Sequence, residues 1–368
     1  MRILVIGGRG NFGVRICRAL AEDPELEVIA AGRSTQRNSG ELSRYGVADS
    51  RLDLASADFA QQLRAFAPAI VVHCAGPFQG QDYRVAEASI NAGSHYIDIA
   101  DARAFVVGFA DALHARATAA DVLAITGASS VPALTSAVLD AMRTRLQQIE
   151  EIQICIAPAQ QAPRGAATIG GVFSYAGRPF DCWKDERWQI VHGWQSMRRV
   201  DFRFMGARLA TVCDVPDLAL FPHRYPGVRT VEFRAALELR LQHYALWTCA
   251  ALRRLGIPLP LERWARPLDR LAGALNRFGS KRGGMLVTVT GRSADNARTR
   301  IDWELSAPDN HGPEIPCMAA RLIARKLKRG SMAMRGALPC VGLLALDDFA
   351  AEFTRWNIST RIDETTLT

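Results

Sequence analysis

The sequence has no hydrophobic run long enough to cross a lipid bilayer, which takes about 18–20 consecutive apolar residues. Its most apolar helical stretch, Tyr244 to Leu252, is followed at once by Arg253 and Arg254. A signal-peptide pattern is missing as well, because a strand-like run begins at Arg2. We therefore expect no integral membrane segment and a cytoplasmic location.

Patterns that hold metals, disulfides or an acyl-transfer nucleophile are also missing. The eight cysteines include no CxxC pair, and the histidines at 192, 223, 243 and 311 lack ligand spacing. Neither HExxH nor GxSxG occurs. Because several cysteines lie within apolar runs, we predict reduced thiols in the core and no metal site.

Lysine is scarce: it occurs only at 184, 281, 326 and 328, although the formal net charge is +8. The positive excess is therefore almost entirely arginine, spread along the chain and densest between Arg321 and Arg329. A spread excess favours anionic small ligands or simple solubility over a nucleic-acid-binding face. We predict a small-molecule substrate and no nucleic-acid partner.

Strand and helix patterns alternate over the first part of the 368-residue chain. The predicted strands are 3–6, 28–31, 47–54, 70–74, 95–99 and 122–126. Six short apolar runs separated by helical patterns are typical of a doubly wound parallel sheet, so the fold class is α/β with an N-terminal Rossmann domain over 1–132.

The regular alternation of strand and helix patterns ends after Glu150. Residues 152–156 alternate like a half-exposed strand, and 285–290 and 299–305 read as two antiparallel strands. Helical patterns cover 240–255 and 262–277. We predict an α+β second domain over 133–330 and a C-terminal segment, 331–368, that packs back on the first domain.

A glycine-rich turn, Gly7-Gly8-Arg9-Gly10-Asn11-Phe12-Gly13, follows the first strand and precedes a helical stripe. In this context Gly8 lets the chain turn, Gly10 lets the backbone approach a pyrophosphate, and Gly13 lets the helix lie close to the strand. The helix N-terminus then offers N–H groups to the phosphates. We predict a dinucleotide site over Gly7 to Gly13, against the alternative of a plain αβ turn.

The residues after the second strand favour NADP over NAD. NAD sites place an Asp or Glu about 20 residues past the glycines, where it accepts from the ribose 2′-hydroxyl. This sequence has Arg33 there, followed by Ser34 and Arg37. A guanidinium pairs instead with a 2′-phosphate, although these arginines could equally be solvated loop residues. Asp53 could accept from the adenine amino group or simply form a turn.

Three segments lie at the ends of the later strands: the loop Ala75-Gly76-Pro77-Phe78, the strand end Tyr96-Ile97-Asp98, and the turn Gly127-Ala128-Ser129-Ser130-Val131-Pro132. With the glycine turn, they resemble the saccharopine dehydrogenase-like NADP-binding family over roughly residues 1–135. The resemblance implies that the first loop flanks the cofactor and that the other two border the nicotinamide. It also implies an inserted substrate domain, a C-terminal return to the Rossmann domain, and a homodimer.

Acid–base candidates must lie near the nicotinamide. Asp98, at a strand end, could hold an amine or relay a proton, or it could be a structural cap. Tyr96 is a second candidate that could simply pack, and Ser130 is a neutral hydrogen-bond partner. Lys281 could clamp an anion or be a solvated charge. The tryptophans at 183, 188 and 194 could wall an apolar pocket or fill a core.

These features predict an NADP-dependent oxidoreductase that transfers hydride between nicotinamide C4 and a C=N or C=O centre of a small molecule. The rival interpretation is a redox sensor that binds NADP(H) without turnover. A full second domain favours the enzyme, because a sensor needs no pocket over the nicotinamide.

Overall fold

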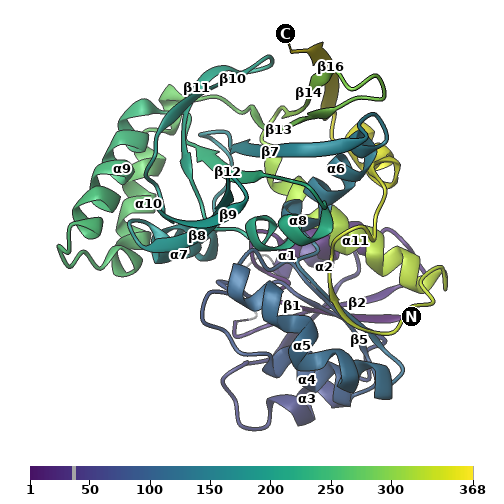
Figure 1. Ribbon diagram of the computed structural model, residues 1–368. Coiled ribbons are helices and arrows are strands. Elements are labelled where there is room, and N and C mark those ends of the chain that lie inside the picture. Colours follow the sequence, from purple (N-terminus) through teal and green to yellow (C-terminus); the bar gives the residue numbers. More distant parts are fainter. Residues whose placement is uncertain (35–38, 368) are drawn as a thin grey trace. The chain divides into compact units, whose positions relative to one another are not determined.

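The computed structural model describes residues 1–34 and 39–367 and divides the chain into two compact units (Figure 1). The N-terminal unit combines Met1–Leu134 with Glu314–Leu344, and the second unit combines Thr135–Pro313 with Ala345–Thr368. The expected boundaries were therefore wrong near the C-terminus. Only the part of the tail up to Leu344 belongs to the N-terminal unit, and a helix placed by expectation in the second domain belongs to the first.

A parallel sheet of seven strands forms the centre of the N-terminal unit, in the order β15-β6-β5-β4-β1-β2-β3. Its strands are β1 (Arg2–Ile6), β2 (Glu27–Gly32), β3 (Ala48–Arg51), β4 (Ile70–His73), β5 (His95–Asp98), β6 (Leu123–Thr126) and β15 (Gly336–Pro339). This confirms the predicted doubly wound α/β fold, with β15 as an unpredicted seventh strand beside β6.

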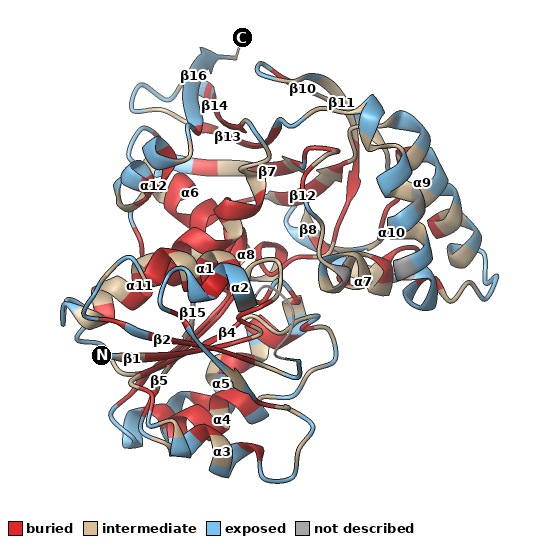
Figure 2. Ribbon diagram, turned by 180° about the vertical axis from the view of Figure 1, so that it is seen from behind, coloured by how far each residue is buried: buried red, intermediate tan, exposed pale blue. Residues whose placement is uncertain are grey.

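Helices cover both faces of this sheet (Figure 2). They are α1 (Gly13–Leu20), α2 (Ser39–Ser43) and α11 (Ile315–Lys328) in one layer, and α3 (Phe59–Ala65), α4 (Arg84–Asn91) and α5 (Arg103–Ala119) in the other. The continuous run Ile3 to Ile6 is buried because both faces of β1 are covered.

A buried ion cluster fastens α11 to α1. The carboxylate of Glu314 lies 3.0 Å from guanidinium nitrogens of Arg18 and Arg321, and 3.2 Å from Nε of Arg15. Glu314 and Arg321 are buried, so their charges are stabilised by each other and by Arg15 and Arg18 rather than by water. The cluster explains in physical terms why the chain returns to the N-terminal unit at Glu314.

The second unit is built on a mixed sheet in the order β10-β11-β12-β7-β13-β14-β16, with a separate hairpin β8–β9. Only the β7–β12 pair in this sheet is parallel among the described pairings. The strands are β7 (Gln148–Ala157), β8 (Pro179–Lys184), β9 (Arg187–His192), β10 (Arg198–Phe202), β11 (Gly206–Val212), β12 (Thr230–Ala236), β13 (Gly283–Arg292), β14 (Arg298–Ala307) and β16 (Ser359–Thr366).

The helices of this unit are α6 (Thr135–Arg143), α7 (Ala166–Tyr175), α8 (Asp217–Arg224), α9 (Arg240–Arg254), α10 (Ala265–Ala274) and α12 (Ala350–Arg355). The antiparallel β13–β14 pair was predicted, and Ile301, Trp303 and Leu305 of β14 are buried together on one face. The final strand, β16, pairs with β14. The tail after Leu344 therefore belongs to the second unit, against the prediction that all of 331–368 belongs with the first.

Candidate functional site

The glycine turn joins β1 to α1 in the N-terminal unit. The structural roles of its glycines differ from the predicted ones. Gly7 has a φ of +77°, so the sharp turn assigned to Gly8 is made at Gly7. A Cβ on Gly13 would lie 2.1 Å from the Gly7 carbonyl oxygen, and one on Gly8 would lie 2.9 Å from Cα of Ala30. Both glycines therefore serve close packing between helix, turn and strand.

Gly10 differs from Gly7, Gly8 and Gly13 because its backbone is not crowded by the rest of the fold. The nearest atom that a Cβ there would meet is the Gly7 carbonyl oxygen, at 3.1 Å. An open approach to backbone beside a helix N-terminus fits the pyrophosphate of a dinucleotide. Asn11 is oriented by Arg15, whose guanidinium donates to Asn11 Oδ1 at 2.8 Å, and the Phe12 carbonyl accepts from the amide of Ile16 at 3.0 Å.

Arg9, between the glycines, is a structural residue that the motif did not reveal. Its buried guanidinium donates to the carbonyl oxygens of Ala30 at 2.9 Å, and of Gly32 and Ser50 at 3.0 Å, and it forms an ion pair with Asp49. It thereby holds the carboxyl ends of β2 and β3, where the adenosine half of a dinucleotide lies in this fold. The sequence could have indicated this role only through the position of an arginine between the glycines of a turn that follows an apolar strand. A charge buried there needs hydrogen-bond acceptors or an acidic partner.

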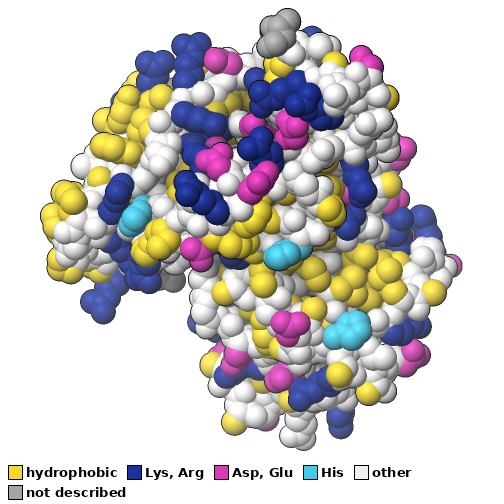
Figure 3. All heavy atoms as spheres, viewed as in Figure 1, with side chains coloured by type: hydrophobic (Ala, Val, Ile, Leu, Met, Phe, Trp, Pro, Cys, Tyr) yellow, Lys and Arg dark blue, Asp and Glu magenta, His cyan; other side chains and the backbone are white. Residues whose placement is uncertain are grey.

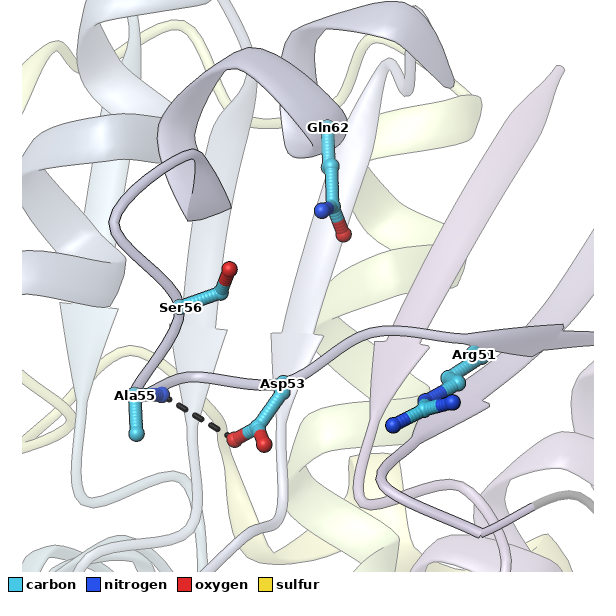
Figure 4. Close-up of a pocket in the computed structure, with 5 residues that line it drawn as sticks. All are labelled: Arg51, Asp53, Ala55, Ser56 and Gln62. Atoms are coloured by element: carbon cyan, nitrogen blue, oxygen red, sulfur yellow. Dashed lines mark hydrogen bonds between the residues drawn. The ribbon is translucent and has the colours of Figure 1, made fainter.

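The predicted adenine end lies at the ends of the same two strands. Arg33 and Ser34 are exposed directly after β2, whereas Arg37 lies outside the described residues. Asp53 accepts a hydrogen bond from the Ala55 amide at 3.1 Å, which matches the turn-forming interpretation. Figure 4 shows Asp53 in a pocket that is also lined by Arg51, Ala55, Ser56 and Gln62. Arg51, which the sequence analysis did not single out, brings a second cation to this end of the sheet.

The loop after β4 is placed beside the glycine turn. A Cβ on Gly7 would lie 2.8 Å from the Ala75 amide nitrogen, so the two segments are in contact. The Gln81 side chain braces this loop by donating to the carbonyl oxygens of Ala75 at 2.9 Å and Pro77 at 2.6 Å. Gly76 lies between these two braced carbonyls, so the loop has a fixed backbone next to the predicted phosphate site.

Phe78 is turned into the protein. It is buried, with its ring centroid 5.0 Å from His73 and 5.4 Å from Phe105. The expectation that Phe78 packs on a ribose or nicotinamide is therefore wrong for the conformation in the structure. The ring instead completes an aromatic cluster between β4 and α5, and that cluster fixes the strand end from which the loop departs.

Asp98 lies at the end of β5 and is completely buried. Its Oδ1 accepts three hydrogen bonds: from the Thr126 hydroxyl at 2.9 Å, the Gly127 amide at 2.8 Å and the Ala100 amide at 2.9 Å. The Tyr96 hydroxyl is a further hydrogen-bond partner of this carboxyl. Burial raises the pKa of Asp98 to about 6, although the hydrogen bonds oppose that rise.

Tyr96 and His73 lie next to this carboxyl on the same sheet. The Tyr96 hydroxyl is 3.1 Å from Nδ1 of His73, and both side chains are buried. Burial lowers the pKa of His73 to about 4, so its imidazole is neutral at neutral pH. Burial, reinforced by the charge of Asp98, raises the pKa of Tyr96. The two residues therefore form an uncharged pair beside a titrating acid.

The loop after β6 carries Ser130 in a turn spanning Ser130–Leu134. Gly127 has a φ of +73°, and a Cβ there would lie 2.7 Å from Cδ of Pro132, so this turn requires glycine. The Asp98 carbonyl accepts from the Ala128 amide at 2.8 Å, which ties the β5 and β6 ends together. The structure thus brings Asp98 and the turn that carries Ser130 to one edge of the sheet.

In the second unit, Lys281 is exposed, and its carbonyl accepts from the Asn310 amide at 2.8 Å. Trp194 is buried, whereas Trp183 and Trp188 form an edge-to-face pair on the β8–β9 hairpin with centroids 5.2 Å apart. A buried acid, Asp217, accepts from the Thr135 hydroxyl at 2.5 Å, and burial raises its pKa to about 7. No pattern in the sequence distinguished Asp217 from a helix-capping aspartate.

Comparison with known proteins decides the identity of the N-terminal unit. Residues 3–125 match the family described as "Saccharopine dehydrogenase NADP binding domain". The N-terminal unit is a saccharopine dehydrogenase-like NADP-binding domain. This confirms the resemblance, the predicted NADP cofactor with NAD as the alternative, and the assignment of the chain as an NAD(P)-dependent oxidoreductase.

Solved structures with the same fold extend over the whole chain. Apo saccharopine dehydrogenase (L-Glu forming) from Saccharomyces cerevisiae is 11% identical, with 99% of this chain and 100% of that chain covered and a TM-score of 0.69. Homospermidine synthase from Legionella pneumophila in complex with NAD is 12% identical, with coverages of 100% and 92% and a TM-score of 0.59. DAP dehydrogenase from C. glutamicum in complex with DAP is 14% identical, with coverages of 95% and 98% and a TM-score of 0.50. No curated protein matches the chain in sequence.

Over the described part of the chain, no helix is both long and apolar enough to cross a membrane. In the same residues, no group of three or more His, Cys, Asp or Glu side chains could hold a metal ion.

Proposed function

We propose that this oxidoreductase transfers hydride between the nicotinamide and a C=N or C=O centre of a small molecule. The observation that carries the proposal is the titrating carboxyl of Asp98 at the end of β5, in the same unit as the NADP-binding turn. Loops at the carboxyl ends of parallel strands meet at one crevice, where ligands bind in this fold. The cofactor, when bound, supplies the hydride at C4 of its nicotinamide ring.

The residues present fit that cofactor at two places. The turn from Gly7 to Gly13 offers open backbone at Gly10 and the N-terminus of α1 to a pyrophosphate. Arg33 and Arg51 bring cations to the ends of β2 and β3, where a 2′-phosphate would need them. Arg9 holds both strand ends in place for these contacts.

We assign the proton-handling role to Asp98. Three hydrogen bonds to its Oδ1 fix the carboxyl in place, and the Tyr96 hydroxyl is a further hydrogen-bond partner of the group. A carboxyl with a pKa of about 6 can both donate and accept a proton near neutral pH. Ser130 would serve as a neutral hydrogen-bond partner, and Tyr96, paired with His73, would keep the carboxyl in place.

The test is turnover of NADPH by the purified protein with panels of imines and ketones. We expect oxidation of NADPH with at least one C=N or C=O compound, and a fall in turnover in Asp98→Asn while NADPH affinity is kept. NADPH binding without turnover on any substrate would favour the redox sensor. A fully active Asp98→Asn would move the proton-handling group elsewhere in the chain.

We further propose a cytoplasmic homodimer acting on a small molecule, in line with the resemblance. Light scattering coupled to size-exclusion chromatography would measure the mass in solution. A monomer at micromolar concentration would contradict this part of the proposal without affecting the chemistry.

A further inference from the structure

The outward face of α9, in the second unit, is apolar. Leu241 and Leu255 are 71% and 78% exposed, and Tyr244 and Leu252 are exposed between them. Leu241, Tyr244 and Leu252 lie on one stripe of the helix, and Leu255, the C-cap residue of α9, continues that stripe. The opposite face carries the buried His243 and Ala250, so the helix is packed by its inner side only. We call these four residues the apolar stripe.

The apolar surface continues along the chain after α9. Ile257 and Trp264 are exposed in the segment that leads to α10, and Phe278 is 62% exposed just after it. We call residues 240–278 the helical arm. In Figure 2 the outer side of α9 is drawn mainly as exposed, and Figure 3 shows hydrophobic side chains gathered at this end of the second unit. Large exposed apolar side chains on one segment mark an interaction surface.

The charge of the arm has one dominant sign. Its acidic residues are Glu262 and Asp269, whereas its basic residues are Arg240, Arg253, Arg254, Arg263, Arg266, Arg270 and Arg277. Glu262 is already paired with Arg253, at 2.8 Å. The exposed arginines at 240, 254, 263, 270 and 277 therefore flank the apolar residues along the arm.

These features together match a helix that lies in a membrane interface. Such helices combine arginine or lysine with leucine and aromatic side chains on a partly exposed face. Tyr244 and Trp264 are aromatic rings of the kind that sit at the headgroup level, because each has an apolar body and a polar group, and Phe278 adds a purely apolar ring. Arg277 lies over the Phe278 ring, 4.7 Å from its centroid, so cation and apolar side chain point to the same region.

We propose that the helical arm docks on the surface of a bilayer that contains anionic lipids. The apolar stripe would enter the headgroup region, and the exposed arginines would face lipid phosphates. A second copy of the chain fits less well, because a symmetric contact would bring arginine-rich surfaces together, and juxtaposed like charges weaken association. An anionic lipid surface instead carries negative charge, which complements the exposed arginines of the arm.

The experiment is flotation of the purified full chain with vesicles of pure phosphatidylcholine and with vesicles containing one third phosphatidylglycerol. We expect binding to the anionic vesicles that falls as salt is raised. The double variant Leu241→Glu/Leu255→Glu should lose at least ten-fold in binding. Each substitution of Arg254 or Arg270 by Gln should weaken binding about five-fold, the value expected for one basic residue near an anionic surface.

The matched control is Val107→Glu/Ile362→Glu, which makes the same charge change at exposed positions of α5 and β16, outside the arm. It should lose far less binding than the arm variant, and both variants should keep the circular dichroism spectrum and NADPH affinity of the wild type. No binding of the wild type to anionic vesicles would overturn the proposal. So would equal loss in both double variants, or a dimer in solution that Leu241→Glu/Leu255→Glu dissociates.

Discussion

Replacing Asp98 by Asn should change how the stability of the protein depends on pH. The pKa of the carboxyl is about 6 in the folded protein, against 3.8 for an ordinary aspartate. That difference corresponds to about 3 kcal/mol of destabilisation when the buried group is ionised. Asn keeps an acceptor oxygen for Thr126, Gly127 and Ala100 but has no charge to bury.

The sign follows from where the proton is held. Below pH 3.8 the group is protonated in both the folded and the unfolded chain, so it contributes no pH dependence. Between that pH and about 6, the unfolded chain releases a proton that the folded chain retains. Wild-type stability therefore falls as pH rises through this window, and the same contribution is absent from Asp98→Asn.

Urea unfolding between pH 4 and 7.5 measures the effect. The free energy of unfolding of Asp98→Asn minus that of the wild type should rise by about 2.4 kcal/mol across this range, since part of the change already lies below pH 4. Asp111→Asn, which removes an exposed carboxyl from α5, should run nearly parallel to the wild type. Parallel curves for Asp98→Asn and the wild type would refute the argument, since they would show that the buried carboxyl does not titrate in this window.

Three further changes test the cofactor site. Gly10→Val should abolish NADPH binding in a fluorescence titration, because its side chain would enter the open space above the turn. Gly40→Val, in uncrowded surroundings on α2, is the control. Unchanged NADPH affinity in Gly10→Val would contradict the assignment of the phosphate site. Arg33→Ala should weaken the binding of NADPH by about 1.5–3 kcal/mol and leave the binding of NADH nearly unchanged. Equal affinity of the wild type for NADH and NADPH would contradict the 2′-phosphate argument. Arg9→Met should cost about 1–3 kcal/mol of stability by leaving the carbonyl oxygens of Ala30, Gly32 and Ser50 without this donor, which a melting temperature equal to that of the wild type would contradict.

The strands of the N-terminal sheet were predictable because covering both faces demands continuous apolar runs, such as Ile3 to Ile6. The glycine turn was predictable because the conformation at Gly7 and the packing at Gly13 tolerate almost no side chain. In both cases the structural requirement is local, so a few adjacent residues in the sequence are enough to reveal it. The location of Asp98 at a strand end followed from the same pattern.

What escaped prediction depends on contacts between distant segments. The four residues of β15 show no periodicity of their own, and they form a strand only because β6 presents an open edge. The direction of Phe78 is decided by His73 and Phe105, and the role of Arg9 by carbonyl oxygens about 21 to 41 positions away. Exposure of the apolar stripe on α9 likewise contradicts the ordinary expectation that leucines face inward.

The discontinuous N-terminal unit has a consequence for biosynthesis. The ribosome releases the first 134 residues well before α11 and β15, which belong to the same unit. Until then the edge of β6 is unpaired, and Arg15 and Arg18 lack the carboxylate of Glu314. The cofactor-binding half can therefore reach its final structure only after the inserted segment has been synthesised. A gene truncated at residue 134 should yield an aggregating fragment, and a chain must extend at least to Pro339 to carry every strand of the first sheet.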